Sequence, residues 1–216
     1  MYTLLLANNK ILYISVMNVS IAVLAGGNSV RFGSDKTLIK LNGKAIIQYI
    51  VDEFIEIANL YIIAKQYEKY SYLNVPIIID KYSEQSPLVG IITALENIES
   101  EYLFIVSADM PFIKKCILYT LINNIDKDTD IILPSINDKI YTLTGVYRRQ
   151  VKSILERHYK MGNYKILDTF KNIKVKMLDN KYFVDSKYNE YSFININNWT
   201  DYKNAERILK KINKKS

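Results

Sequence analysis

Apolar and polar positions follow one another along this chain in two alternating patterns. Short continuous apolar runs are typical of buried strands, and apolar residues at helical spacing are typical of helices packed on a core. The apolar runs predict strands at 19–25, 60–64, 75–80, 102–108, 129–133 and 140–147. The helical spacing predicts helices at 45–57, 88–98, 113–125, 150–159 and 198–212. This alternation predicts an α/β fold with a single doubly wound, mostly parallel sheet, helices on both faces, and ligands at the carboxyl ends of the strands.

The first sixteen residues, MYTLLLANNKILYISV, stand apart from this pattern. The stretch is apolar, but Asn8, Asn9 and Lys10 interrupt it, it has no basic start, and no small-residue cleavage site follows. It therefore fits neither a signal peptide nor a membrane span of about 20 residues. We expect one domain over 17–216 and an N-terminal extension over 1–16. Either the natural start is Met17, or the extension adds an edge strand or a loose arm.

Composition narrows the class of protein. A chain of 216 residues with 49% hydrophobic and 24% charged residues can bury a core and is not expected to be disordered. The single cysteine, Cys116, excludes an internal disulfide and predicts a reducing, cytoplasmic location. The net charge of +7 has no aromatic and basic recognition motif beside it, so we expect neither a nucleic-acid nor a membrane partner. Positive potential would also attract substrates that carry several phosphates.

The segment from Leu24 to Lys44, LAGGNSVRFGSDKTLIKLNGK, follows the first predicted strand and has the features of a phosphate-binding loop. Gly26 and Gly27 allow backbone conformations that a side chain would obstruct, so a phosphate can approach the bare amides. Arg31 and Lys36 add two cations to the same loop. The order of residues departs from the Walker pattern, in which a Gly-Lys-Ser/Thr ending opens a helix.

This segment resembles the signature of the molybdenum cofactor guanylyltransferases, the MobA-like branch of the nucleotidyltransferase superfamily. The signature runs LAGG, a few residues, Arg, Met or Phe, Gly, and then Asp-Lys, and the stretch up to Lys36 fits it throughout. The resemblance implies a Rossmann-like nucleotidyltransferase fold and transfer of GMP from GTP to the terminal phosphate of molybdenum-molybdopterin. It implies a catalytic role for Arg31 and Lys36. The nucleotide contacts that it implies here come from Leu24, Ala25, Gly26, Gly27 and Lys36.

Two aspartates end predicted strands and should face the same crevice as this loop. Asp109, in the segment SADMPF, resembles the aspartate of the family's CDTPF-like motif. The resemblance implies that Asp109 is a catalytic, nucleotide-binding residue and holds Mg²⁺, with triphosphate oxygens and water as the other ligands. A cap for the following helix is the alternative. Asp80 is expected to bind the nucleotide, and its alternative is a plain turn residue.

Three further residues resemble substrate-side positions of the family. Gly90 ends SPLVG, which is similar to the family's GPLxG element, although Ser86 replaces the first glycine. Asn195 and Asn197, in FININNW, match the two asparagines of the family's FxNxNTPEDL element and are implied to bind the acceptor's phosphate or pterin. A strand-end turn that caps the last helix is the alternative for both. At Lys65 the chain departs from the family, which often has an asparagine that touches the nucleotide.

The resemblance also implies a mechanism and a set of partners. The acceptor phosphate, already ionised near neutral pH, would attack the α-phosphorus of GTP in line and expel pyrophosphate, so catalysis would depend on positioning and charge neutralisation. GTP and molybdenum-molybdopterin are the expected substrates, with cofactor-handling proteins and acceptor molybdoenzymes as candidate protein partners. CMP transfer to molybdopterin, nucleotidyl transfer to a sugar phosphate, and a silent nucleotide-binding regulatory domain remain as alternatives.

Overall fold

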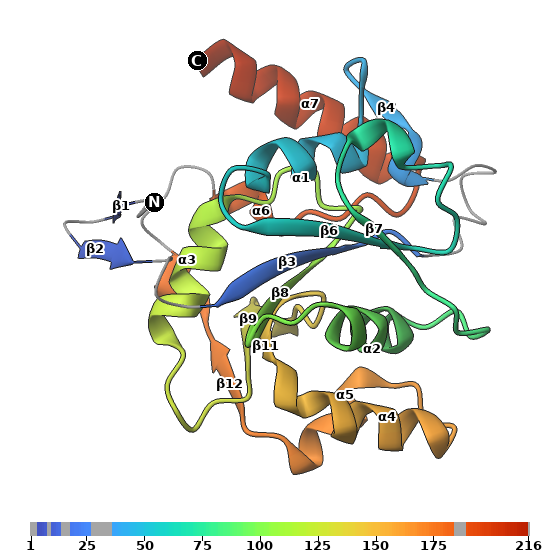
Figure 1. The fold of residues 1–216 in the computed structure, drawn as a ribbon. Coiled ribbons are helices and arrows are strands. Elements are labelled where there is room, and N and C mark those ends of the chain that lie inside the picture. Colours follow the sequence, from blue (N-terminus) through green and yellow to red (C-terminus); the bar gives the residue numbers. More distant parts are fainter. Residues whose placement is uncertain (1–3, 8–9, 14–17, 27–35, 184–188, 216) are drawn as a thin grey trace.

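The computed structural model describes residues 4–7, 10–13, 18–26, 36–183 and 189–215. Within these residues, eight strands form the central sheet (Figure 1). They are β3 (Val19–Leu24), β6 (Asn59–Ala64), β7 (Ile77–Ile79), β8 (Tyr102–Ser107), β9 (Ile131–Ile136), β10 (Lys139–Ile140), β11 (Thr144–Arg148) and β12 (Val175–Leu178). Their order across the sheet is β10-β9-β11-β8-β3-β6-β7, and β12 pairs with β9.

Strand β3 lies between two parallel neighbours. It pairs with β8 from Val19 opposite Tyr102 onward, and with β6 on its other side, while β6 pairs in parallel with β7. These four strands therefore end at the same edge of the sheet. Strand β11 runs antiparallel to both β8 and β9. The predicted mostly parallel sheet is confirmed, but the predicted single strand at 140–147 is divided into β10 and β11.

Helices cover both faces of this sheet, as predicted (Figure 1). The α-helices are α1 (Ile46–Phe54), α2 (Pro87–Asn97), α3 (Lys115–Asn124), α4 (Lys152–Lys160), α5 (Ile166–Thr169), α6 (Asn189–Ser192) and α7 (Trp199–Lys215). The short 3-10 helices are η3 (Lys36–Leu38), η4 (Ser71–Leu73), η5 (Arg149–Val151), η6 (Phe170–Asn172) and η7 (Asn180–Phe183). No helix among the described residues is long and apolar enough to cross a membrane.

The two faces of the sheet bury separate apolar cores, and alternate residues of β3 contribute to each. Ile21 and Val23 join the core that α1 and α3 cover, whereas Ala22 and Leu24 join the core that α2 and α4 cover. Every residue of β3 is buried, because side chains of a strand point alternately to the two faces and helices cover both. This explains why the strand is apolar in the sequence except at Ser20, whose buried hydroxyl is hydrogen-bonded to Ser100 Oγ.

Two short hairpins lie outside the central sheet. Strands β1 (Leu4–Ala7) and β2 (Lys10–Tyr13) pair antiparallel with each other in a sheet of their own, rather than as an edge of the central one. Strands β4 (Lys40–Leu41) and β5 (Lys44–Ala45) are joined by Asn42 and Gly43, whose φ angles of 50° and 83° suit a tight hairpin turn.

The packing of β11 generates the first prediction. A Cβ atom at Gly145 would lie 2.2 Å from Leu133 Cδ2 and 2.9 Å from the main-chain oxygen of Ile132, so Gly145→Ala forces a neighbouring strand to move. We expect the free energy of unfolding in urea to fall by about 1–3 kcal/mol, as for other overpacked cores.

The matched control is a glycine-to-alanine change without such a clash. At Gly90 in α2 the added Cβ would lie 3.5 Å from Leu24 Cδ1, an ordinary contact. Because alanine is favoured over glycine within helices, Gly90→Ala should leave stability unchanged or raise it by up to about 1 kcal/mol. A Gly145→Ala protein as stable as the parent would show that the described packing of β11 on β9 is wrong.

Candidate active site

The common edge of β3, β6, β7 and β8 opens into two adjoining cavities of about 180 Å³ and 170 Å³. The first is lined by Ala25, Gly26, Lys65, Gln66, Lys69, Tyr70, Asp80, Glu84, Gln85 and Ser86. The second is lined by Leu24, Ala25, Gly26, Lys36, Thr37, Ile63, Asp80, Ser86, Pro87, Gly90, Ser107, Ala108, Asp109 and Leu143. Taken together they reach the size of ordinary small-molecule sites, which begins at roughly 300 Å³.

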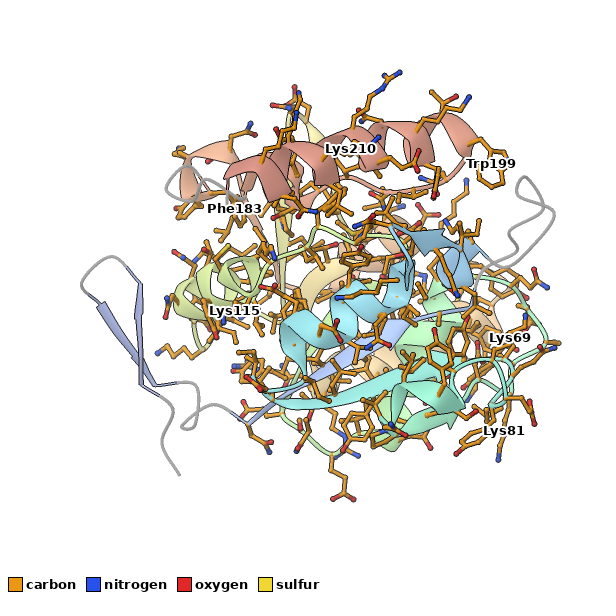
Figure 2. The ribbon with its side chains drawn as sticks, turned by 90° about the horizontal axis from the view of Figure 1, so that it is seen from above. Lys69, Lys81, Lys115, Phe183, Trp199 and Lys210 are labelled. Atoms are coloured by element: carbon orange, nitrogen blue, oxygen red, sulfur yellow. The ribbon has the colours of Figure 1, made fainter. Side chains whose placement is uncertain are left out.

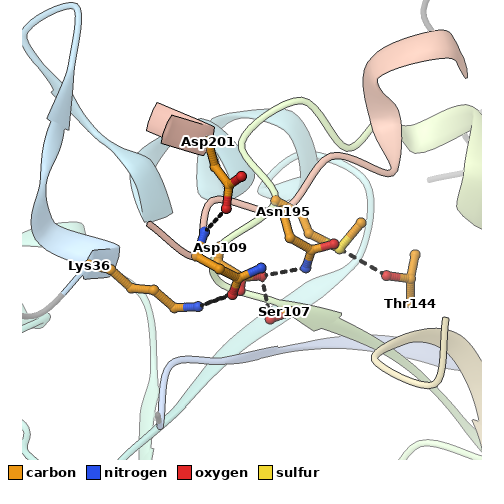
Figure 3. A network of polar contacts seen from close by, with 8 residues as sticks. Lys36, Ser107, Asp109, Thr144, Asn195 and Asp201 are labelled. Carbon is orange, nitrogen blue, oxygen red and sulfur yellow. Dashed lines mark hydrogen bonds and ion pairs between the residues drawn. The ribbon is translucent and has the colours of Figure 1, made fainter. Parts of the chain in front are cut away.

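Asp109 follows β8 and lies at the centre of a polar network in the second cavity (Figure 3). Its Oδ2 atom lies 2.6 Å from Lys36 Nζ. Its Oδ1 atom accepts hydrogen bonds from Ser107 Oγ at 2.7 Å and from Asn195 Nδ2 at 2.9 Å. Its main-chain oxygen accepts the amide of Ile196 at 2.9 Å. Both the carboxylate and the backbone of Asp109 are therefore held in place by several different segments.

The alternative interpretation of Asp109 as a helix cap is wrong. Helix α3 begins at Lys115, and its N-cap position is Lys114, well beyond Asp109. The aspartate instead lies in the turn between β8 and α3, with its side chain 8% exposed.

Lys36 connects two segments that are far apart in the sequence. Its Nζ atom donates to Asp109 Oδ2 at 2.6 Å and to Asn197 Oδ1 at 2.9 Å. The lysine side chain is 18% exposed, so the ion pair is largely buried away from water. Ion pairs of this kind are stronger than exposed ones because water competes less with them.

The two asparagines expected on the substrate side both point toward the Lys36–Asp109 pair rather than capping α7. The cap is Asn198, whose Oδ1 accepts the amide of Asp201 at 3.0 Å. Asp201 Oδ2 in turn accepts the amide of Asn197 at 2.8 Å (Figure 3). The segment before α7 is not a strand. The capping interpretation of Asn195 and Asn197 is therefore wrong.

Asp80 follows β7 and faces both cavities. Its Oδ2 atom lies 3.0 Å from Lys65 Nζ. Its Oδ1 atom accepts two hydrogen bonds, from Thr93 Oγ1 at 3.2 Å and from the main-chain amide of Tyr82 at 3.0 Å. The last contact, to the residue two positions later, is an Asx turn. The plain turn interpretation is thus correct for one oxygen, while the carboxylate also belongs to the cleft.

Lys65, the chain's departure from the family pattern, fixes the wall of the first cavity. In addition to Asp80, its Nζ atom donates to the main-chain oxygens of Tyr82 and, at 3.4 Å, Glu84. From the other side the Tyr159 hydroxyl donates to Glu84 Oε2 at 2.8 Å. This hydrogen bond lowers the pKa of Glu84 and raises the pKa of Tyr159 to about 12. Sequence reasoning noted the substitution at 65 but did not find this role.

The serine that replaces the family's glycine has a structural role. Ser86 is the N-cap of α2: its Oγ accepts the amide of Leu88 at 3.2 Å, and Pro87 occupies the first helical turn. The same hydroxyl donates to the main-chain oxygen of Tyr164 at 3.1 Å. Gly90 is buried in α2 against Leu24 and lines the second cavity.

The remaining sequence predictions fall into two groups. Leu24, Ala25 and Gly26 line the cavities, and their predicted contacts with the nucleotide stay predictions. Gly27 and Arg31 lie outside the described residues, so their roles stay predictions. Ser107, which sequence reasoning missed, could have been found because it lies two positions before Asp109 at the end of the same strand.

The donor set at the cleft suits a hard cation that a ligand helps to hold. The described residues contain no group of three or more His, Cys, Asp or Glu side chains able to hold a metal ion by themselves. Mg²⁺ is commonly held by one or two carboxylates together with substrate phosphates and water. Asp109 and Asp80 both line the second cavity and provide such carboxylates. The residues present therefore fit Mg²⁺ in company with a nucleotide.

Comparisons with known proteins agree with this site. Residues 21–174, more than half of the chain, match the model of the MobA-like NTP transferase domain. A probable molybdenum cofactor guanylyltransferase of Natranaerobius thermophilus is 37% identical over 202 residues, covering 90% of this chain and 98% of that protein. A protein of the same description from Carboxydothermus hydrogenoformans is 31% identical over 195 residues, covering 90% and 97%.

A solved structure supports the same assignment. Molybdopterin-guanine dinucleotide biosynthesis protein A of Archaeoglobus fulgidus superposes with a TM-score of 0.79 at 25% identity, covering 89% of this chain and 99% of that one. On the family model and these similarities, the chain belongs to the MobA-like NTP transferase family.

Proposed function

We propose that this protein transfers GMP from GTP to the terminal phosphate of molybdenum-molybdopterin, forming the guanine dinucleotide cofactor and releasing pyrophosphate. The relatives named above are guanylyltransferases by description. The observation in the structure that carries the proposal is the Lys36–Asp109 pair, 2.6 Å apart, at the edge where the parallel strands end. In such a pair the lysine can bind a triphosphate oxygen, and the carboxylate can bind the Mg²⁺ that accompanies the triphosphate.

The first cavity and the strand end suit the nucleotide. Ala25 and Gly26 line both cavities, so the backbone at the end of β3 can follow a ligand from one to the other. Among the described residues, no atom beyond the chain neighbours of Gly26 lies within 4 Å of the place where a Cβ would be, which suits a ligand beside the backbone. We place the base in the first cavity, beside Lys65 and Asp80, and the triphosphate in the second, beside Lys36.

When bound, Mg²⁺ would be held by Asp109 and would neutralise charge on the phosphates. The chain's own residues position this carboxylate: Ser107 and Asn195 fix one oxygen, and Lys36 faces the other. The acceptor phosphate oxygen forms a bond to the α-phosphorus while the bond to pyrophosphate breaks. The chain needs no protein base for this step, because a phosphate monoester is already ionised near neutral pH.

Asn197 and Asn195 stay our candidates for the acceptor side. Both amides lie against the Lys36–Asp109 pair, which is where an acceptor phosphate must arrive if it is to attack a nucleotide held there. An amide can donate and accept, so either group could bind a phosphate or a pterin edge. We also propose a role for Arg31 and Gly27 in phosphate binding, on the sequence resemblance alone.

The alternatives make different uses of the same cleft. CMP transfer, or transfer to a sugar phosphate, would keep Lys36 and Asp109 and change the base or the acceptor. A silent regulatory domain would not need the metal-binding carboxylate. We also propose a cytoplasmic location, in keeping with the single cysteine, and contacts with cofactor-handling proteins or acceptor molybdoenzymes.

A direct assay tests the proposed reaction. The protein is incubated with Mg²⁺, molybdenum-loaded molybdopterin and each of the four labelled nucleoside triphosphates in turn, and the products are separated. We expect label from GTP to be joined to molybdopterin. Transfer of CMP, or transfer only when a sugar phosphate replaces molybdopterin, would establish the corresponding alternative, and binding of GTP without any transfer would favour the regulatory one.

A substitution at Asp109 tests the site itself. Asp109→Asn keeps the size of the side chain but removes the charge, so turnover should fall on the order of a hundredfold or more while the protein stays folded. Turnover is measured in steady state and folding by thermal unfolding. Asp126→Asn is the matched control, because that carboxylate contacts Thr129 beyond the opposite end of the sheet and should leave turnover unchanged. Near-normal turnover of folded Asp109→Asn would remove Asp109 from the catalytic residues.

Lys65 offers a separate test of the nucleotide wall. Lys65→Met keeps a long side chain but releases Asp80 and the carbonyls after it, so the dissociation constant for GTP should rise by about tenfold, the cost of roughly one charge-assisted hydrogen bond. Lys81→Met is the control: Lys81 directly follows Asp80 in the chain but is exposed at the surface of the molecule (Figure 2). Equal losses in both variants would mean that general charge, and not the wall, explains the effect.

A further inference from the structure

A buried tyrosine hydroxyl joins Ala25, at the end of β3, to Thr37, the residue after Lys36. Tyr70 lies just before η4, in the connection between β6 and β7, and is 1% exposed. Its hydroxyl lies 3.1 Å from the main-chain oxygen of Ala25, at the end of β3, and 2.9 Å from Thr37 Oγ1. One oxygen atom thus contacts a residue near the start of the family signature and the residue directly after its end.

The direction of these hydrogen bonds follows from the number of protons. A phenol has a single proton to donate, and a carbonyl oxygen can only accept. The Tyr70 proton therefore goes to Ala25, and the Thr37 hydroxyl donates to Tyr70. Thr37 is 5% exposed, so both hydrogen bonds lie where water competes little and where such chains strengthen each other.

These two hydrogen bonds fix the main-chain position of Lys36, the lysine that faces the Asp109 carboxylate. Ala25 is itself held, because its amide donates to the Ile63 oxygen of β6 at 2.9 Å. Thr37 immediately follows Lys36 in η3. Holding Thr37 against the end of β3 therefore limits where the Lys36 side chain can begin. From that position its Nζ atom reaches Asp109 at 2.6 Å.

We propose that Tyr70 is a positioning residue for nucleotide binding, and that its hydroxyl acts through Lys36. The ring belongs to the core under α1, so its packing stabilises the fold whether or not the hydroxyl is present. The hydroxyl adds a different property: it joins Ala25, at the end of β3, to Thr37, and so limits the positions that the neighbouring Lys36 can take before a ligand binds. This inference rests on the proposed binding of GTP.

Tyr70→Phe removes the hydroxyl and keeps the ring. The dissociation constant for GTP in the presence of Mg²⁺ should rise by about tenfold, as expected when one or two neutral hydrogen bonds are lost. In a Lys36→Ala background the same change should raise it by less than about twofold, because a residue that acts through Lys36 has little left to position. A purely structural role would give equal factors in both backgrounds.

Two further variants complete the test. Tyr102 lies at the start of β8, away from the cleft, and its hydroxyl accepts a hydrogen bond from Arg148 Nη2. Tyr102→Phe removes this hydroxyl. It should lower thermal stability without weakening GTP binding. Thr37→Val removes the hydroxyl that is hydrogen-bonded to Tyr70, with little change in the shape of the side chain. It should reproduce the loss of Tyr70→Phe, and the double variant should be no worse than either, so the inference can be judged even if Tyr70→Phe folds poorly.

Clear results would overturn the inference. GTP affinity within about twofold of the parent in both Tyr70→Phe and Thr37→Val, or equal losses with and without Lys36, would each exclude the positioning role. Failure of the proposed function looks different: a parent protein that binds GTP but transfers no GMP to molybdopterin would contradict the function, while the coupling between Tyr70 and Lys36 would still be measurable by binding.

Discussion

The parallel pairing of β3 with β6 and β8 is the constraint on which the rest of the molecule depends. Parallel strands require crossovers, and the crossovers here are helices that cover both faces of the sheet. Every strand in this group therefore ends at one edge, and the segments that follow must turn there. Gly26, Asp80 and Asp109 come together because they follow β3, β7 and β8, and β7 joins this parallel group through β6.

The two buried carboxylates at that edge are paired with lysines and hydrogen-bonded before any ligand binds. Asp80 and Asp109 have side chains only 5% and 8% exposed, and burying a carboxylate is unfavourable unless it is paired and hydrogen-bonded. Each has a lysine within 3.0 Å, from a different segment, and at least two further donors. The carboxylates can therefore be held in fixed orientations for a metal and a polyanion, which is the condition for electrostatic catalysis.

The positions at which this chain departs from its family are compensated locally. Ser86 takes the place of a glycine, and it caps α2 and donates a hydrogen bond to the main-chain oxygen of Tyr164. Lys65 takes the place of an asparagine, and it holds Asp80 and two carbonyls of the cavity wall. Both changes alter the wall of the first cavity and leave the Lys36–Asp109 pair untouched.

The sequence determined the order of strands and helices, because local periodicity reflects which faces are buried. It also placed Asp80 and Asp109 at strand ends, since a parallel sheet fixes where those ends lie. It could not separate β10 from β11 or show that β11 is antiparallel, because a buried strand is equally apolar in either direction. Nor did the short strand β12 stand out, since its pairing with β9 depends on contacts distant in sequence.

Tertiary structure alone decided which polar groups meet. Lys36 and Asn197 are 161 positions apart, and Tyr70 contacts both Ala25 and Thr37 from the connection between β6 and β7. No local pattern records such contacts, because a side chain's partner depends on where the backbone of a distant segment passes. The residue types in the sequence therefore indicated the chemistry of the site, and only the folded chain decided how Lys36, Asp109 and the two asparagines are held against one another.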